Sequence, residues 1–457
     1  MSTKGHTTPQ PKLSKQAITL LNLGHLLRRA GFGAANDEVH AAARQGHRAT
    51  IDQLINYDQV PDTFTQPDSS VFGQDPRRSP IEPLTRWWLG QMISTTRPLQ
   101  EKMVLFWHGH FATAFYKVHN TTFMYGQNQL FRDNALGRFD DLLTGIYKDP
   151  AMLIWLDGQR NIKAQPNENF GREVMELFTL GRGNYTEDDV HANARAFTGW
   201  HIAPDGQAVF VPRLHDFGPK TLLGQTGNWG ADDAVSILAA HSSTGPFLAG
   251  RLWRFFASDQ PPASILHEMA RAYYHSDHSI AAMVGTMLRS PQFYSAQTRT
   301  MHVKSPTDFL VTTIRQMGLT DVDLTTAPHM LALLGQELFN PPNVGGWPGG
   351  MTWINGGTML TRFNIASQFT GDAYAPKSAI DPELVLNGMV NGITMDDVVT
   401  YLAGMLGVSL TTGTKQALLG YAGGHRLQIA TLTTADLDIK TRGLIHLLMV
   451  SPEYQMA

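Results

Sequence analysis

The sequence predicts a mainly α-helical protein, built as one large multi-helical unit with long loops and a minor β-hairpin. Segments in which apolar residues recur at helical spacing follow one another through most of the 457-residue chain. Only residues 207–213 have a strand-like pattern, and we expect them to form one arm of a hairpin. Hydrophobic residues make up 42% of the chain, and its 22 Phe and 9 Trp indicate a large folded core.

The individual helices are predicted from apolar spacing and from capping residues. Pro98 opens one helix, Asn167 caps another, and Thr186 with Asp189 forms a capping box for a third. A Pro- and Asp-rich stretch, residues 60–83, predicts a long loop. In chain order, helices are predicted at residues 17–29, 84–94, 99–114, 122–135, 139–147, 167–181, 186–198, 232–240, 245–257, 262–274, 280–290, 306–317 and 328–338.

We expect the chain to have three parts. Residues 1–16 are polar and predict a flexible N-terminal arm. Residues 17–370 predict the main helical domain, which carries the functional site. Residues 371–457 are poorer in Trp and His and predict a C-terminal helical subdomain packed on the main domain.

Composition excludes several classes of protein. A net charge of −3, without a run of Lys and Arg longer than two, argues against a nucleic-acid partner. The absence of cysteine excludes disulfides, thiolate metal sites, iron–sulfur clusters and covalently attached haem c. The longest apolar runs fall far short of about 20 residues, so no membrane span is predicted. The first residues lack the apolar segment of a secretory signal, which favours a cytoplasmic over a periplasmic location.

Residues 167–181, N-E-N-F-G-R-E-V-M-E-L-F-T-L-G, form the most informative segment, which we name the Glu helix. At 100° per residue, its three glutamates and Arg172 share one polar arc. Glu173 and Glu176, three residues apart, can share a cation, share a proton or repel each other in water. The alternative is a solvated face with ion pairs from Glu168 to Arg172 and from Arg172 to Glu176.

The motif W-H-G-H-F places His108 and His110 near the end of a predicted helix. On a regular helix the two side chains diverge by about 200°, so they can share a ligand only if Gly109 breaks the helix. Together with Glu173 and Glu176 they would suit a divalent metal such as Zn, Mn or Fe. The alternative is one hydrogen-bonded core histidine and one surface histidine.

The motif H-D-F-G-P-K-T, residues 215–221, follows the strand candidate. Lys220 can anchor an anionic group, and His215 with Asp216 can act as an orienting pair or as ligands. Arg195 can be a second anion clamp or a structural ion-pair partner for a glutamate. The alternative for the motif is a simple polar turn.

A Gly- and Pro-rich loop spans residues 339–357. Its Trp347 and Trp353 can stack on sugar rings or other flat ligands, or they can anchor a loop that covers the core. The segment lacks the pattern of a phosphate-binding P-loop. The chain also has no G-x-S-x-G motif and no G-x-G-x-x-G after a strand. The usual classes of serine hydrolase and dinucleotide-binding protein are therefore excluded.

These motifs resemble the large bacterial DUF1800 proteins over nearly the whole chain. That resemblance implies one unit spanning residues 20–455 and supplies no reaction. Members are often encoded beside a DUF1501 protein, similar to sulfatase-like and phosphatase-like enzymes, which implies a shared pathway or complex. Many relatives carry a signal peptide, and this chain departs from that pattern. The matching blocks include R-R-A-G-F-G (28–33), R-P-L-Q-E-K-M-V-L-F-W-H-G-H-F-A-T (97–113), D-P-A-M-L (149–153), the Glu helix, A-R-A-F-T-G-W (194–200), H-D-F-G-P-K-T (215–221), L-W-R-F-F (252–256) and N-P-P-N-V-G-G-W-P-G-G (340–350).

Two hypotheses follow. The first is a metal-assisted or acid/base hydrolase or transferase that acts on an anionic or polyhydroxylated substrate. The second is a non-catalytic helical scaffold or binding partner of a DUF1501-like protein, with the charged residues in a structural ion-pair network. In the first, the catalytic residues are Glu173, Glu176, His215 and Asp216; the substrate-binding residues are Arg172, Arg195, Lys220 and Trp347; and the metal ligands are His108, His110, Glu173 and Glu176.

Overall fold

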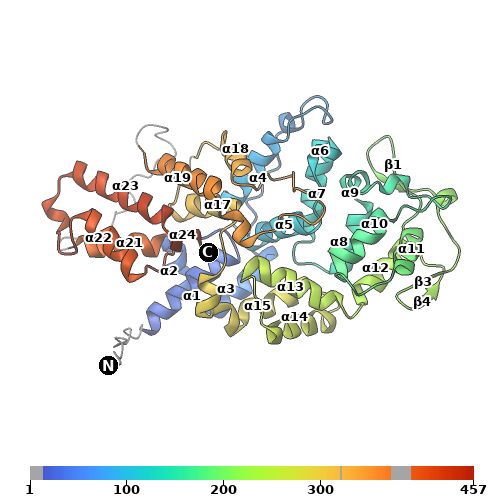
Figure 1. Ribbon diagram of the computed structural model, residues 1–457, viewed down its shortest axis with the longest axis horizontal. Coiled ribbons are helices and arrows are strands. Elements are labelled where there is room, and N and C mark those ends of the chain that lie inside the picture. The colour runs from blue at the N-terminus through green and yellow to red at the C-terminus, as the bar shows by residue number, and fades with distance from the viewer. Residues whose placement is uncertain (1–13, 320–321, 372–392, 457) are drawn as a thin grey trace, which may run out of the picture.

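The chain is an elongated assembly of helices with two small β-hairpins at one end (Figure 1). The computed structural model describes residues 14–319, 322–371 and 393–456. The predicted mainly α-helical class is confirmed. Most of the predicted N-terminal arm lies outside the described residues, and α1 begins at Lys15.

The centre of the molecule is built around α5, whose side chains are nearly all buried. Its M-V-L-F-W run is apolar on every side, as a helix surrounded by others requires. Neighbouring helices enclose it, and the long loop predicted at residues 60–83 connects two of them. The helices of this part are α1 (Lys15–Arg29), α2 (Asn36–Gln45), α3 (His47–Ile55), α4 (Glu82–Ser94), α5 (Pro98–His110), α6 (Phe115–Val118) and α7 (Thr121–Asp133).

The end that carries the Glu helix contains α8 to α12 and both hairpins (Figure 1). Strand β1 (Trp200–Ile202) pairs antiparallel with β2 (Ala208–Phe210), which confirms the predicted hairpin. A second hairpin, β3 (Lys220–Leu222) with β4 (Gln225–Gly227), was not predicted. The helices are α8 (Phe139–Lys148), α9 (Pro150–Trp155), α10 (Glu168–Glu173), α11 (Glu187–Ala196) and α12 (Ala231–Ala240).

Two further groups of helices complete the fold (Figure 1). One lies beside α3 and α5 and consists of α13 (Thr244–Phe256), α14 (Ala263–His275), α15 (Ile280–Arg289) and α16 (Ala296–Thr300). The other forms the opposite end of the molecule and consists of α17 (Pro306–Gln316), α18 (Ala327–Leu333), α19 (Gly356–Thr370), α21 (Met395–Met405), α22 (Thr412–Ala422), α23 (Thr434–Val450) and α24 (Pro452–Gln455).

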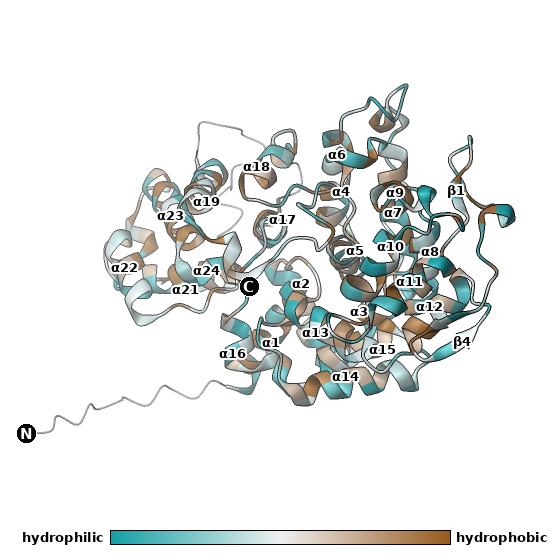
Figure 2. Cartoon of the chain, turned by 45° about the vertical axis from the view of Figure 1, so that its right-hand side comes forward, coloured by the Kyte–Doolittle hydropathy of each residue, from teal (hydrophilic) through white to brown (hydrophobic). Residues whose placement is uncertain are grey.

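One continuous core runs through these groups. Figure 2 shows apolar residues on helix faces that meet other helices, and polar residues on many outer faces. Trp88, Trp107 and Trp253 are among its largest fully buried side chains. In the described parts of the chain, no helix is both long enough and apolar enough to span a bilayer. The boundary expected near residue 370 stays a prediction, and residues 372–392 beside it lie outside the described chain.

Every helix predicted from apolar spacing is present, with ends that differ by a few residues. The largest difference at a C-terminus is in α18, which ends at Leu333 because Gly335 (φ +92°) turns the chain. Gly109 does not break α5, which continues to His110. The Glu helix is irregular, and this decides how its charged residues are placed.

Candidate functional site

The Glu helix changes its winding immediately after Glu173. Regular α10 ends there, and residues Val174–Thr179 form a π-helix. The amide of Leu180 donates to the carbonyl of Met175 (2.8 Å), five residues earlier. Such single-turn π segments occur often at functional sites. The predicted caps are confirmed, since the side chain of Asn167 accepts from the helix start and Gly181 has φ +77°.

The π turn separates the environments of the two central glutamates. Glu176 accepts from Arg182 Nε (2.6 Å) and from the hydroxyl of Tyr185 (2.8 Å). These hydrogen bonds lower the pKa of Glu176. The half-buried Glu173 makes no hydrogen bond or ion pair within the described chain. Burial, and then the charge of Glu176, raise the pKa of Glu173.

Arg172 belongs to a surface ion-pair network. Its guanidinium donates to both carboxylate oxygens of Glu187 (2.8 and 2.6 Å) and to Glu168 (3.2 Å). The other oxygen of Glu168 lies 2.6 Å from His191 Nδ1. The predicted Glu168–Arg172 pair is therefore confirmed. The predicted Arg172–Glu176 pair was wrong, because Arg172 pairs with Glu168 and Glu187, and Glu176 pairs with Arg182.

His108 is a buried core histidine. The amide of Phe339 donates to its Nε2 (3.0 Å), so this nitrogen carries no proton and the imidazole is neutral. Burial lowers the pKa of His108 to about 3. The ring centroids of Trp88 and Trp347 lie 5.3 and 5.4 Å from the centroid of the imidazole.

His110 faces a different part of the core. Its Nε2 lies 3.0 Å from the carbonyl oxygen of Phe178, in the π-helix, and must therefore donate to it. The other ring nitrogen, Nδ1, is buried without a partner. Burial holds the pKa of His110 well below its ordinary value. The two histidines thus have opposite hydrogen-bonding roles and diverge, as a continuous helix requires.

The structure does not assemble the predicted metal-ligand set. Across residues 14–319, 322–371 and 393–456, no three His, Asp or Glu side chains are grouped closely enough to hold a metal ion. His108 and His110 use their Nε2 atoms for backbone hydrogen bonds, and Glu176 is bound by Arg182. The prediction required a break at Gly109, and the unbroken helix keeps the imidazoles apart.

The motif at residues 215–221 forms a closed structural cluster. Asp216 accepts from Arg195 Nε (2.6 Å) and Nη2 (3.2 Å), a two-point ion pair that lowers the pKa of Asp216. The Nζ of Lys220 donates to the carbonyls of Asp216 (2.5 Å) and Gly218 (3.0 Å). His215 is buried, and its Nδ1 lies 2.9 Å from the carbonyl of residue 198.

These contacts decide between the alternatives for that motif. Arg195 is an ion-pair partner, although its partner is an aspartate and not a glutamate. The ammonium of Lys220 donates to two carbonyls, and the residue is only 2% exposed, which argues against a role in anchoring a substrate. His215 and Asp216 point to different partners and do not form an orienting pair. The contacts support a polar turn that fixes the hairpin to α11.

The Gly- and Pro-rich loop packs on the W-H-G-H-F segment. A Cβ on Gly346, which has φ +78°, would lie 2.2 Å from the carbonyl oxygen of Gly109. Glycine at position 346 therefore permits this contact, whereas a Cβ on Gly109 would meet only Trp347 Cε3, at 3.9 Å. Trp347 is half-buried against His108, and Trp353 is buried. The arrangement supports a loop that covers the core.

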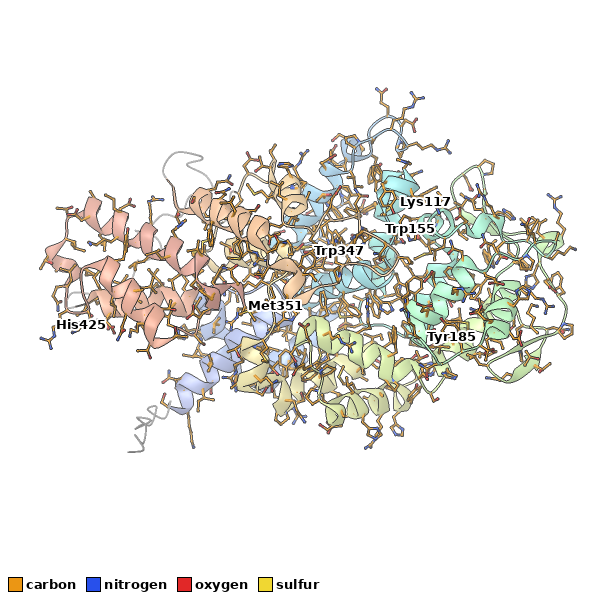
Figure 3. All side chains as sticks on the ribbon, in the orientation of Figure 1. Lys117, Trp155, Tyr185, Trp347, Met351 and His425 are labelled. Atoms are coloured by element: carbon orange, nitrogen blue, oxygen red, sulfur yellow. The ribbon has the colours of Figure 1, made fainter. Side chains whose placement is uncertain are left out.

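The predicted residues do not line one cleft. Figure 3 shows Trp347 near the middle of the molecule and Tyr185 well apart from it, beside the Glu helix. A cavity of about 610 Å³ lies between α2, α3 and residues 93–98, and none of the predicted residues lines it. Sequence reasoning missed Arg182 and Tyr185. The signal for them is the turn at Gly181 and Gly183, which brings the chain back beside the glutamates.

The fold and these contacts define a large helical protein that has a polar acidic face at one end and buried neutral histidines in its core. A family model described as "Protein of unknown function (DUF1800)" matches residues 25–456. The chain therefore belongs to the DUF1800 family, as its motifs indicated. No curated protein and no solved structure matches it.

Proposed function

We propose that this protein is an enzyme that uses acid/base chemistry, of the hydrolase or transferase class, with Glu173 as the group that transfers the proton. One observation carries the proposal. Two carboxyls three residues apart are in environments that raise the pKa of Glu173 and lower the pKa of Glu176. When the environments of two neighbouring carboxyls shift their pKa values in opposite directions, one of them commonly acts as the acid or base and the other stays charged.

The surroundings of Glu173 support this role. A general base must be free to reach the proton that it takes, and Glu173 has no protein partner in the described chain. Glu176 cannot serve in its place, because Arg182 and Tyr185 hold both of its oxygens. Burial, together with the fixed negative charge of Glu176, favours the protonated form of Glu173 and so raises its pKa towards neutral pH.

Cations beside the glutamates favour the proposed substrate class. The side chain of Arg182 is 85% exposed, and Arg172 lies on the same helix as Glu173. Guanidinium groups suit phosphate, sulfate and carboxylate groups and also the hydroxyls of sugars. The metal-assisted version finds less support, because the residues proposed as ligands are not grouped.

Turnover of a substrate panel tests the proposal. The panel contains p-nitrophenyl esters of phosphate, sulfate and acetate and p-nitrophenyl glycosides. We expect turnover of at least one substrate, and a loss of about 100-fold or more in Glu173→Gln without loss of thermal stability. Asp188→Asn, which removes an exposed carboxylate of α11 that binds no cation in the described chain, is the matched control and should keep its activity. Full activity in Glu173→Gln, or no turnover by the unmodified protein, would contradict the proposal.

A second candidate function is a scaffold or binding partner of a DUF1501-like protein. It is favoured by the ion pairs of Arg195 with Asp216 and of Arg172 with Glu187, which connect α10, α11 and the turn at residue 216. Co-purification with a DUF1501-like protein encoded beside it tests this function. A scaffold predicts that Glu173→Gln and Glu176→Gln weaken the complex or the fold, whereas the enzyme hypothesis predicts that Glu173→Gln affects turnover alone.

A further inference from the structure

A small buried cavity lies where the end of α1 meets α5, α17 and the segment between α16 and α17. Its wall carries Arg28, Arg29, Lys102 and Lys304, together with one carboxylate, Asp308. We name this group the cationic cavity. Helices α1 and α17 lie away from α10 along the long axis of the molecule (Figure 1), so the cavity is separate from the Glu helix.

The cavity contains more positive than negative charge. Asp308 pairs with Lys102, so its charge is already matched. Four cationic side chains against one carboxylate leave an excess of three positive charges when all are ionised. Arg29 and Lys304 are only 2% and 1% exposed. Burying ions without partners is strongly unfavourable, so this wall is incomplete without a negative charge.

Several hydrogen-bond donors of the cavity wall have no acceptor. Within the described chain, Arg28 Nε, Arg29 Nε and Arg29 Nη1 are buried without a partner. Arg29 uses only Nη2, which donates to a backbone carbonyl at 2.8 Å. The Nζ of Lys304 lies 3.3 Å from the ring centroid of Tyr454 and donates no hydrogen bond within the described chain. Buried N–H groups are rarely left unpaired, so these donors point to a ligand.

Loss of protons does not remove the excess charge. Burial lowers the pKa of Arg28 to about 10 and the pKa of Arg29 to about 9, so both remain charged at neutral pH. Burial, with the charge of Arg28, holds the pKa of Lys304 well below its ordinary value. With Lys304 neutral, an excess of two positive charges remains. The fully buried Arg362 beside it, which donates to the carbonyl of Lys304 (2.8 Å), adds another cation.

We propose that the cationic cavity binds a compact inorganic anion, held by the guanidinium groups of Arg28 and Arg29 and by the ammonium of Lys304. Guanidinium forks match the geometry of phosphate and sulfate oxygens. The open space of about 10 Å³ at the centre is close to the minimum that holds one water molecule. It suits a monatomic anion, admits phosphate or sulfate only if the side chains move apart, and excludes a nucleotide or a sugar phosphate.

The anion would also join α1 to the C-terminal helices. A Cβ on Gly407, which follows α21, would lie 2.3 Å from Nη1 of Arg28, so the two segments are in close contact. The amide of Lys304 donates to the carbonyl of Gln455 in α24 (2.9 Å). Two of the anion-binding residues are thus held by segments that are far from α1 in the sequence. Anion binding should therefore stabilise the whole chain.

Anion titration of the full chain tests the proposal. Phosphate, sulfate and chloride are each added at constant ionic strength to protein in gluconate, and Tm and calorimetric binding are measured. We expect a saturable rise in Tm of about 2 °C or more with at least one anion. A response to phosphate and sulfate assigns the site to oxyanions, and a response to chloride alone assigns it to halides.

Lys304→Met separates anion binding from a general effect of salt. Because burial already disfavours the charged form of Lys304 when no anion is bound, the substitution should not lower Tm in gluconate, but it should weaken anion binding at least 10-fold. Loss of a merely structural lysine would lower Tm and leave anion binding unchanged. Arg44→Gln, which removes an exposed cation that forms no ion pair with the described residues, is the matched control and should respond like the unmodified protein. Arg28→Gln provides the same comparison if Lys304→Met does not fold. The proposal is overturned if no anion gives a saturable response, or if the cavity variant that folds keeps the full response.

Discussion

Replacing His108 by Gln tests whether this residue is a neutral hydrogen-bond acceptor in the core. Gln can still offer an oxygen to the amide of Phe339, but it cannot take up a proton near neutral pH. It also lacks the ring that packs between Trp88 and Trp347. We therefore expect His108→Gln to be less stable at pH 7 by about 1–3 kcal/mol.

The pH dependence of that difference follows from the burial of His108. The pKa of His108 is about 3 in the folded protein and about 6.5 in the unfolded chain. Between these values the unfolded chain binds the additional proton, so the contribution of His108 is present above pH 6.5 and is lost as the pH falls. Going from pH 7 to pH 5 should cost the unmodified protein about 2 kcal/mol that His108→Gln does not lose.

Urea unfolding at pH 7, 6 and 5, followed by circular dichroism, measures the effect. The other buried histidines titrate in both proteins, so the difference between the two curves isolates His108. The stability deficit of His108→Gln should shrink by about 2 kcal/mol between pH 7 and pH 5. The exposed His40→Gln is the matched control for loss of an imidazole. A deficit that stays constant over this range would refute the argument, and a change in the curves on adding a chelator would favour metal ligation instead.

Three further substitutions test close contacts of the fold by chemical denaturation. Gly346→Ala should destabilise by at least about 2 kcal/mol, because its Cβ overlaps the carbonyl of Gly109 and its φ is positive. Gly171→Ala should cost about 1–2 kcal/mol despite a better helix propensity, since its Cβ would lie 2.9 Å from the backbone of α11. Asp216→Asn should cost about 1–2 kcal/mol at neutral pH, because Arg195 loses its partner. Arg195 lowers the pKa of Asp216, so this last difference should begin to shrink as the pH falls below about 3.9, and it should disappear only at the lower pH at which the native carboxylate is protonated.

The helices could be predicted because the information that specifies them is local. The caps at Asn167 and Gly181 and the capping box at Thr186 were identified from neighbouring residues and are present. The π turn after Glu173 was not predictable in this way. Whether one turn of a helix adopts π winding depends on how the surrounding elements pack against it. Beyond such a turn, a fixed rotation of 100° per residue gives the wrong direction for the side chains.

The histidines show a second limit of reasoning from sequence. His108 and His110 have the residue type and the spacing of ligands, but their partners come from distant segments. The amide that binds His108 belongs to Phe339, 231 residues later, and the carbonyl that binds His110 belongs to Phe178. Backbone groups carry no signature of their own in a sequence, so a buried histidine that binds them cannot be distinguished from a ligand.

The cationic cavity had a detectable signal that the interpretation of the motifs did not use. Arg28 and Arg29 stand in an apolar helical segment, and Lys102 precedes the apolar run of α5. A single cation in such a place usually extends its charged end to solvent. When three cationic side chains occur in segments that must be buried, solvent cannot reach all of them. A shared negative charge then lowers the free-energy cost of burying them. Asp308 supplies one such charge and leaves the rest uncompensated.

The two proposed sites depend on unpaired charges of opposite sign. At the Glu helix a carboxyl lacks a partner at a half-exposed surface, where a substrate can arrive and leave and proton transfer is useful. In the cationic cavity Arg29 and Lys304 are almost fully buried, where exchange is slow and a tightly held ion contributes to stability. The two proposals can therefore fail separately. Glu173→Gln should reduce turnover by the same factor whether or not Lys304→Met has removed anion binding. A different factor would show that the two sites are energetically coupled.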